Sequence, residues 1–384
     1  MQRKTKPFPA VHKTKAFDTL LQERLDDRES KNLHRSLTLN DSKIDFSSND
    51  YLGFSKLPAL KTKVDSALGA GSTGSRLISG NSGEAEKTEE IIARFHHAEA
   101  ALIFNCGYMA NVGLFSSIAN KGDTIISDAY IHASIIDGIR LSLANKFKFS
   151  HNNIADLEQK LKRASGNKFV VVESLYSMDG DEAPLQLIAD LCDKYHALLL
   201  VDEAHATGVF GNNGEGLVSK YQLQEKVFAR VFTYGKALGL HGAAVTGSAT
   251  LRNYLINFSR PFIYSTALPP HTCQQIQIAY QLLPQANRQP LFDLIDYFKN
   301  SVKTLSEYSF IDSPSQIQGI IIGDNTKAKN LSDYLLQKGM YAKAILSPTV
   351  PAGTERLRIC LHSYNTTSQV DLLLEEIQNF LELN

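Results

Sequence analysis

Apolar and polar residues alternate in blocks along the middle of the chain, and the blocks are of two kinds. Short apolar runs predict buried strands, and the segments between them have the apolar spacing of helices. The strand candidates are residues 100–104, 123–127, 168–173, 197–202 and 227–233, and clear helical segments are residues 86–97 and 184–195. This alternation is typical of an α/β fold in which helices cover both faces of a mostly parallel sheet. Ligands of such folds bind at the carboxyl ends of the strands.

The N-terminal part of the chain predicts a helical arm. Phe17, Leu20, Leu21 and Leu25 recur at helical spacing among charged residues and would form one apolar face. A short strand at residues 44–46 follows, and it leads into a turn.

The pattern changes again after Pro269 and Pro270, which separate the alternating region from a shorter C-terminal part. This part contains strand candidates at residues 318–323, 341–345 and 356–361 and helix candidates at residues 327–338 and from residue 368 onward. We therefore predict three regions. They are residues 1–54 (an N-terminal arm and small segment), residues 55–268 (a large α/β domain) and residues 269–384 (a smaller C-terminal α+β domain).

Composition places the chain among soluble globular proteins, because 43% of its residues are hydrophobic and 21% are charged. Forty basic and forty acidic residues cancel, so no overall field attracts the protein to nucleic acid or to an anionic membrane. The first 15 residues lack the apolar core of a secretory signal, and no apolar run reaches the roughly 18 residues of a membrane span. We expect a cytoplasmic protein. The four cysteines are far apart, so neither a metal site nor a disulfide framework is expected.

The strongest indication of chemistry is a set of three residues: a lysine, an acid and a histidine. Lys236 lies in a turn rich in small residues, and Asp202 and His205 follow the apolar run at residues 197–201. A lysine amine can form a Schiff base with the aldehyde of pyridoxal phosphate (PLP), an acid can keep the pyridine nitrogen protonated, and a histidine can face the ring's phenolic oxygen. The ordered set predicts a PLP enzyme, although no single member of it would.

The four letters at residues 202–205, Asp-Glu-Ala-His, also occur in nucleic-acid helicases, where the acids serve Mg-ATP. That alternative requires a phosphate loop that ends in Gly-Lys-Ser or Gly-Lys-Thr. The nearest candidate, residues 69–76, has no such lysine. Together with the absence of net charge, this makes the helicase interpretation the weaker one.

Other candidates lie where strands end. Gly107 and Tyr108 open a helix after the strand at residues 100–104, and the amides of a helix N-terminus bind phosphate well. His132 could stack on a cofactor ring, although a lone histidine is more often a core residue. Ser177 follows the strand at residues 168–173, and Thr233 ends the strand that precedes Lys236. Both hydroxyls could bind a cofactor.

A carboxylate of the substrate would need a cationic partner. Arg356 and Arg358 alternate on a predicted strand and would share one face. A guanidinium fits the carboxylate of an amino acid, but a solvated strand face explains the pair about equally well. Arg35 is a weaker candidate for the same role.

Taken in order, several segments resemble the α-oxoamine synthases. These are PLP-dependent enzymes of the aspartate aminotransferase fold (fold type I) that join an amino acid to an acyl thioester and release carbon dioxide. The segments are residues 49–53, 74–81, 177–180, 202–205 and 233–239. Residues 262–270, residues 317–319 with 323–325, and residues 348–354 are most similar to the biotin-pathway branch of this family. The substrates of that branch are L-alanine and pimeloyl-CoA or pimeloyl-acyl carrier protein.

The resemblance implies roles for individual residues. It makes Lys236 the Schiff-base lysine and base, Asp202 the partner of the ring nitrogen, His205 the contact to the ring oxygen and His132 the stacking group. The implied cofactor-binding positions are Gly107, Tyr108, Ser177 and Thr233, and Thr266 would reach the phosphate of the neighbouring subunit in a homodimer. The implied substrate-binding positions are Arg35, Asn49, Thr349 and Arg358. No metal is implied.

Two alternatives stay open within this interpretation. A sister synthase that uses glycine would share every cofactor residue, and a pseudoenzyme would keep the fold without the chemistry. Ala206, Tyr234 and Leu240 differ from the commonest residues of the biotin-pathway branch. The acyl chain is therefore predicted less firmly than the type of reaction.

Overall fold

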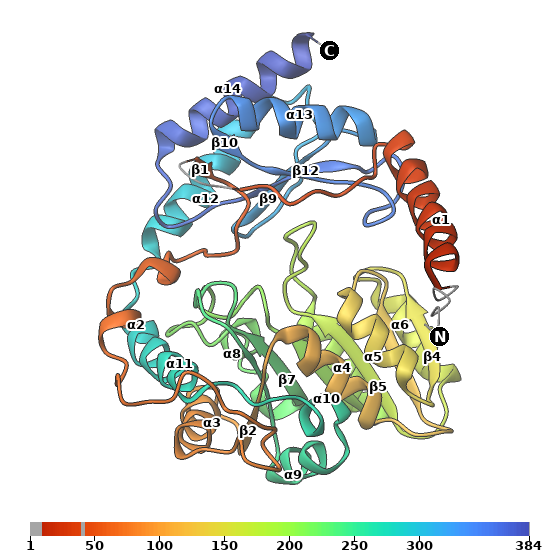
Figure 1. Ribbon diagram of the computed structural model, residues 1–384, viewed down its shortest axis with the longest axis vertical. Coiled ribbons are helices and arrows are strands. Elements are labelled where there is room, and N and C mark those ends of the chain that lie inside the picture. Colours follow the sequence, from red (N-terminus) through yellow and green to blue (C-terminus); the bar gives the residue numbers. More distant parts are fainter. Residues whose placement is uncertain (1–9, 40–42, 384) are drawn as a thin grey trace, which may run out of the picture.

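The computed structural model describes residues 10–39 and 43–383. A seven-stranded sheet forms the centre of its large domain, which is the lower half of Figure 1. Strands β7, β6, β5, β3 and β4 are parallel, and β8 is antiparallel to its neighbours β7 and β2. From edge to edge the order is β2 (Ala100–Phe104), β8 (Ala243–Gly247), β7 (Val227–Thr233), β6 (Ala197–Asp202), β5 (Lys168–Glu173), β3 (Thr124–Asp128) and β4 (Asn145–Phe149).

Apolar side chains cover both faces of this sheet, as expected for strands buried between helices. Along β5, Val170 and Val172 contribute to one core cluster, and Phe169 and Val171 contribute to the other. The first cluster includes α3 (Gly83–Phe95), α7 (Leu185–Tyr195) and α11 (Pro270–Leu282). The second includes α4 (Gly107–Ser117), α5 (Ala133–Leu141) and α9 (Ala249–Phe258). Alternation along single strands therefore fixes which helices lie on which face.

Polar side chains start several helices where the sequence leaves a strand or loop. The side chains of Ser82, Asn153, Ser248 and Asp324 accept hydrogen bonds from backbone amides in the first turns of α3, α6 (Ile154–Arg163), α9 and α13 (Asn325–Gln337). Such caps satisfy amides that have no partner inside the helix. The short helices of the large domain are α2 (Ala59–Thr62), α8 (Leu217–Lys220) and α10 (Arg260–Ile263).

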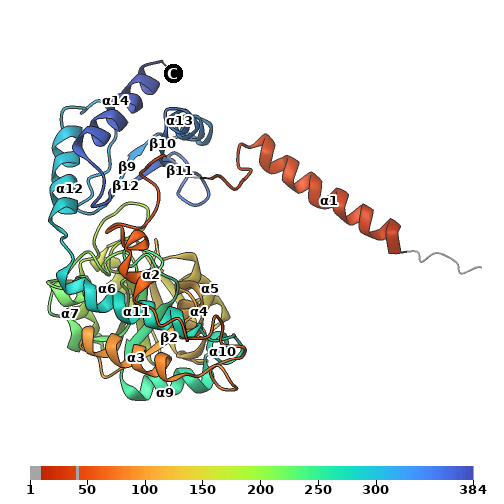
Figure 2. The same cartoon turned by 60° about the vertical axis from the view of Figure 1, so that its left-hand side comes forward.

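The small domain, the upper half of Figure 1, is built on a three-stranded antiparallel sheet, β11 (Lys343–Ile345), β12 (Arg356–Cys360) and β9 (Ile317–Ile321). Helices α12 (Gln289–Val302), α13 and α14 (Thr367–Leu383) accompany this sheet. The N-terminal strand β1 (Ile44–Asp45) pairs with β10 (Met340–Tyr341) of this domain. Helix α1 (Ala10–Ser30) projects away from the rest of the molecule in Figure 2.

The chain passes between the domains at two places, both on the left in Figure 1. The first is the segment after β1, where the backbone amide of Ser363 in the small domain donates to the carbonyl of Tyr51. The second is the link from α11 to α12. Helix α11 packs on α3, since Thr88 Oγ1 donates to the carbonyl of Cys273 at 3.1 Å, whereas Tyr297 of α12 donates to Asp371 of α14.

The fold agrees with the prediction in most elements. Strands β2, β5, β6 and β7 have the predicted bounds, and β3 begins one residue later than predicted. The predicted strand at residues 341–345 is two short strands, β10 and β11, which belong to different sheets. The three predicted domain ranges stay a prediction. No helix in the part of the chain that the structure describes is both long and apolar enough to cross a membrane.

Candidate active site

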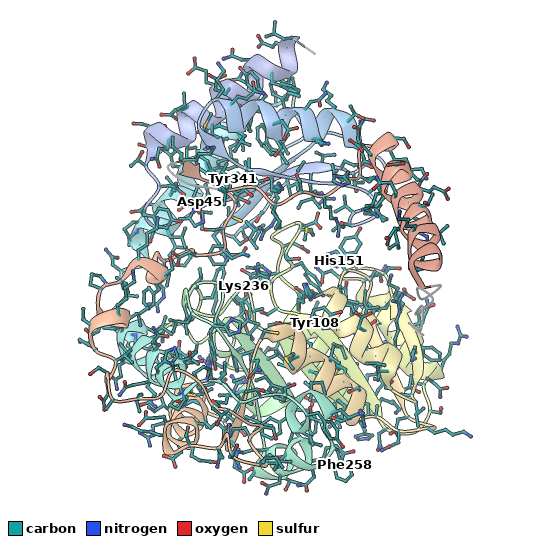
Figure 3. The ribbon with its side chains drawn as sticks, viewed as in Figure 1. Asp45, Tyr108, His151, Lys236, Phe258 and Tyr341 are labelled. Atoms are coloured by element: carbon teal, nitrogen blue, oxygen red, sulfur yellow. The ribbon has the colours of Figure 1, made fainter. Side chains whose placement is uncertain are left out.

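The carboxyl ends of β5, β6 and β7 meet at one edge of the sheet and line a cavity of about 240 Å³. Glu173 and Asp202 are direct neighbours in the register of β5 and β6. The lining residues are Asn49, Cys106, Gly107, Tyr108, Asn111, His132, Ser134, Glu173, Asp202, Ala204, Thr233, Gly235, Lys236, His241 and Gly242. In Figure 3, Lys236 and Tyr108 lie at the edge of the large domain that faces the small domain.

Lys236 is held in the turn between β7 and β8. The amide of Gly239 donates to the carbonyl of Lys236 at 2.8 Å, and the amide of Leu240 donates to the carbonyl of Tyr234 at 2.8 Å. Gly239 has a φ of 60°, and a Cβ there would lie 2.6 Å from the Cα of Ser55. The turn therefore requires glycine at position 239.

The Lys236 amine is poised for chemistry near neutral pH. Burial lowers its pKa to about 8, although the negative charges of Asp202 and Glu173 act in the opposite direction. Removing an ammonium group from water disfavours its charged form, whereas a nearby carboxylate favours it. Burial is the larger effect here, so the amine is a better nucleophile and base than an ordinary lysine.

Asp202 is buried, and two donors fix its carboxylate. Asn111 Nδ2 donates to Oδ2 at 2.8 Å, and the backbone amide of Ala204 donates to Oδ1 at 2.9 Å. Asn111 Nδ2 also donates to Ser134 Oγ at 3.0 Å. Asn111 is thus a positioning residue that the sequence did not reveal, because a helical asparagine carries no signal of its own.

His132 caps the start of α5 and lines the same cavity. The backbone amide of Ser134 donates to His132 Nδ1 at 3.2 Å, and Ser134 Oγ lies 2.8 Å from the same nitrogen. An amide can only donate, so a neutral His132 carries its proton on Nε2.

His205 is buried one turn after Asp202. Its Nδ1 lies 2.8 Å from the hydroxyl of Tyr51, and its carbonyl accepts a hydrogen bond from Gln316 Nε2 at 2.9 Å. Burial, followed by the positive charges of Lys236 and Arg358, keeps the pKa of His205 well below its usual range. His205 is therefore neutral at pH 7.

Glu173 is an acid of the cavity to which the sequence analysis gave no role. It is buried, and its Oε1 has no hydrogen-bond partner among the residues that the structure describes. Burial, followed by the charge of Asp202, raises the pKa of Glu173 to about 8, so the group is mostly protonated at pH 7. The available signal was its position at the end of a buried strand, which it shares with Asp202.

The part of the cavity formed by the start of α4 and the end of β7 suits a phosphate. Gly107 and Tyr108 begin α4 without a side-chain cap, so the first amides of the helix are free to bind an anion. A Cβ at Gly107 would overlap the side chain of Thr233. Thr233 Oγ1 is buried and has no partner among the described residues, and Tyr108 donates to Asp137. An uncapped helix start, an unpaired hydroxyl, a lysine and an acid in one cavity fit PLP.

The substrate-binding candidates lie beside this cavity or away from it. Arg358 of β12 donates from Nε to the carbonyl of Ser177 at 2.6 Å and from Nη2 to Asn49 Oδ1 at 3.1 Å. Ser177 and Thr349 line a second cavity of about 360 Å³ that Arg356 also borders. Arg356 is paired with Asp179, so its guanidinium is not free to bind a carboxylate.

Two candidates lie apart from these two cavities. Arg35 is exposed in the segment after α1 and lines neither of them. Thr266 is exposed, and its carbonyl accepts from Asn105 Nδ2 at 2.7 Å. The roles of Arg35 and Thr266, like the other individual assignments, stay predictions.

His151 joins the segments that carry His132 and Ser177. Its Nδ1 lies 2.9 Å from Asp128 Oδ1, and its Nε2 lies 2.8 Å from Asp181 Oδ2. Burial opposes a charge on this ring, but the hydrogen bonds to the two carboxylates together raise the pKa of His151 to about 9. A protonated His151 therefore bridges two carboxylates beside the second cavity.

Comparison with known proteins decides the family. The model of the aminotransferase class I and II family matches residues 41–377. The chain belongs to this family. It is 41% identical to an 8-amino-7-oxononanoate synthase of Emericella nidulans over 94% of this chain and 95% of that protein. It is 40% identical to another of Lysinibacillus sphaericus over 87% of each.

Solved structures of the family agree with this assignment. A serine palmitoyltransferase from Sphingomonas wittichii has a TM-score of 0.87 at 30% identity and covers 95% of this chain and 97% of its own. An 8-amino-7-oxononanoate synthase from Francisella tularensis has a TM-score of 0.78 at 32% identity and covers 89% of this chain and 99% of its own. A further serine palmitoyltransferase structure, at 29% identity, is described as a PLP internal aldimine. The comparisons confirm the predicted α-oxoamine synthase resemblance, fold type I, the PLP cofactor and the acyltransferase class.

Proposed function

We propose that this protein condenses L-alanine with a pimeloyl thioester, either pimeloyl-CoA or pimeloyl-acyl carrier protein. The products would be 8-amino-7-oxononanoate, carbon dioxide and the free thiol, as in biotin biosynthesis. The observation that carries the proposal is the arrangement of Lys236, Asp202 and His132 around one cavity, with Arg358 next to it. The chain has this arrangement together with 41% identity to a protein named for the same reaction.

The residues that would hold PLP follow from the site. Lys236 would hold its aldehyde, Asp202 its ring nitrogen, and the amides at the start of α4, with Thr233, its phosphate. Bound PLP supplies a conjugated ring that accepts electrons from the carbon attached to the substrate nitrogen. Asn111 keeps the Asp202 carboxylate in place by the 2.8 Å hydrogen bond.

The remaining groups bind substrate and move protons. At pH 7 about one Lys236 in ten is uncharged with a pKa of about 8, compared with on the order of one in a thousand ordinary lysines. Lys236 can therefore take the α-proton of the amino acid and return a proton to the product. Arg358 would bind the carboxylate of alanine, with Asn49 beside it.

We further propose a homodimer in the cytoplasm in which Thr266 reaches the cofactor phosphate of the neighbouring subunit. Leu77, Ile78 and Tyr264 support this proposal, because they are exposed apolar side chains close in sequence to Ser75 and Thr266, which pair with each other. Contiguous exposed apolar side chains are typical of an interface. Light scattering during gel filtration would give the mass of the assembly.

One experiment tests the reaction. The purified protein is mixed with PLP, L-alanine and pimeloyl-CoA, and the product is identified by mass spectrometry while the free thiol is measured. Parallel reactions contain glycine with acetyl-CoA or succinyl-CoA, because a glycine-using sister enzyme would prefer them. Borohydride reduction and peptide mapping should place the cofactor on Lys236. A pseudoenzyme would form no product, and a cofactor adduct at another lysine would contradict the assigned site.

A further inference from the structure

A chain of three hydrogen bonds connects Arg358 to His205 through the N-terminal segment. Arg358 Nη2 donates to Asn49 Oδ1 at 3.1 Å, the Tyr51 hydroxyl lies 3.0 Å from the same oxygen, and that hydroxyl lies 2.8 Å from His205 Nδ1. Tyr51 is fully buried. The segment that carries Asn49 and Tyr51 is one of the two connections between the domains.

The donor and acceptor roles in this chain can be assigned from Arg358. A guanidinium only donates, so the atom of Asn49 that faces Arg358 must be the amide oxygen. The same oxygen faces Tyr51, so the single hydroxyl proton of Tyr51 points to Asn49. The lone pairs of the Tyr51 oxygen are then left for His205, and Nδ1 of His205 must be the donor.

The opposite assignment would lose a hydrogen bond. If Tyr51 donated to His205 Nδ1, the hydroxyl oxygen and Asn49 Oδ1 would face each other at 3.0 Å as two acceptors. Asn49 Oδ1 would keep only the hydrogen bond from Arg358, and two oxygen atoms facing each other with no proton between them are costly in a partly buried site. The histidine is neutral because burial and the positive charges of Lys236 and Arg358 disfavour its charged form, so it carries one proton only.

We infer that Tyr51 is a positioning residue that places the proton of neutral His205 on Nδ1 and leaves Nε2 as a hydrogen-bond acceptor. Nε2 has no hydrogen-bond partner among the residues that the structure describes. The inference rests on the proposed function in one respect, since an unprotonated Nε2 would accept a hydrogen bond from the phenolic hydroxyl of PLP. Because Arg358 orients Asn49, the group proposed to bind the substrate carboxylate also determines the proton position on His205.

The position of this proton can be measured by NMR. Full-length protein is labelled with ring-¹⁵N histidine and studied with and without PLP, and the His205 signals are assigned by their loss in His205→Gln. In the wild type, Nδ1 should have the shift of a protonated nitrogen and Nε2 that of an unprotonated one. The opposite pattern in both states would overturn the inference.

Two variants remove the constraint in different ways. Tyr51→Phe keeps the ring and deletes the hydroxyl, and Asn49→Ala removes the acceptor to which the hydroxyl donates, which frees its proton to turn toward His205 Nδ1. Both should move the proton of His205 toward Nε2, which a role of Tyr51 in packing alone would not produce. Unchanged His205 shifts in both variants would refute the role, and Asn49→Ala keeps the test decisive even if Tyr51→Phe folds poorly.

A matched control comes from a second buried tyrosine and histidine. Tyr280 OH lies 2.9 Å from His96 Nε2, so Tyr280→Phe deletes an equivalent bond elsewhere and should leave the His205 signals unchanged. In the holoenzyme, Tyr51→Phe should also change the pH dependence of the visible absorbance of PLP and lower kcat about tenfold, which corresponds to ~1.4 kcal/mol. The NMR measurement needs no turnover, so a failure of the inference is distinguishable from a failure of the proposed reaction.

Discussion

Gly239 provides a sharp test of how the turn around Lys236 is held. We predict that Gly239→Ala is harmful for two separable reasons. Its φ of 60° is unfavourable for any residue with a Cβ, and the added Cβ would lie 2.6 Å from the Cα of Ser55. The left-handed conformation costs roughly 1–2 kcal/mol, and forcing an atom into a packed site costs about 1–3 kcal/mol. We therefore expect a loss of roughly 2–5 kcal/mol in the free energy of unfolding.

Gly339 is a matched control for the first of these costs. Its φ is 81°, but a Cβ there would meet no atom within 4 Å. Gly339→Ala should therefore lose only the conformational cost, about 1–2 kcal/mol, and keep full turnover. Urea unfolding followed by circular dichroism measures both variants, and the thiol-release assay measures turnover. Equal losses of stability in the two variants would refute the close contact between Gly239 and Ser55.

Three further predictions concern charged groups. In the apoprotein, the rate at which an amine-selective reagent modifies Lys236 should rise with pH with a midpoint near 8. Asp202→Asn should lower that midpoint, because it removes a negative charge that raises the pKa of Lys236. The folded-state pKa of His151 is raised to about 9. The stabilisation that protonated His151 gives to the folded protein is therefore complete below the unfolded-state pKa of about 6.5, and it is lost as pH rises through about 9. The melting temperature should fall over that window in the wild type but not in His151→Gln, and a parallel fall in both would exclude this histidine as the cause. Arg358→Lys should raise KM for the amino acid about 10- to 100-fold with a smaller change in kcat, because lysine cannot make the two-point contact of a guanidinium; an unchanged KM would remove Arg358 from carboxylate binding.

The sequence predicted the buried strands of the large domain better than the strands at the edges of its sheet. Strands β5, β6 and β7 are continuous apolar runs because helices cover both of their faces, and such runs have clear ends. Strand β4 was missed because Lys146 and Lys148 interrupt its apolar residues, as is common at the edge of a sheet. The break at Ala342 was also missed, since neighbouring residues there pair with different sheets.

The site was predictable where it follows from strand ends and not where it depends on distant segments. Asp202 and Thr233 end parallel strands, and Lys236 lies just beyond one of them, so the topology alone brings them together. Tyr51 and Asn111 contact this group from parts of the chain far away in sequence, and no local pattern indicates such contacts. Likewise, the pairing of Arg356 with Asp179 joins two domains, so the sequence could not show which of the two arginines is held in an ion pair.

The two passages of the chain between the domains limit how the small domain can move. Both lie on the same side of the molecule (Figure 1), so they would form a hinge for a rotation of the small domain. A rotation that opens the two domains about this hinge would break the hydrogen bond from Arg358 to the carbonyl of Ser177. It would also move the guanidinium away from the strand ends. The proposed binding of the substrate carboxylate by Arg358 therefore depends on the position of the small domain relative to these strand ends.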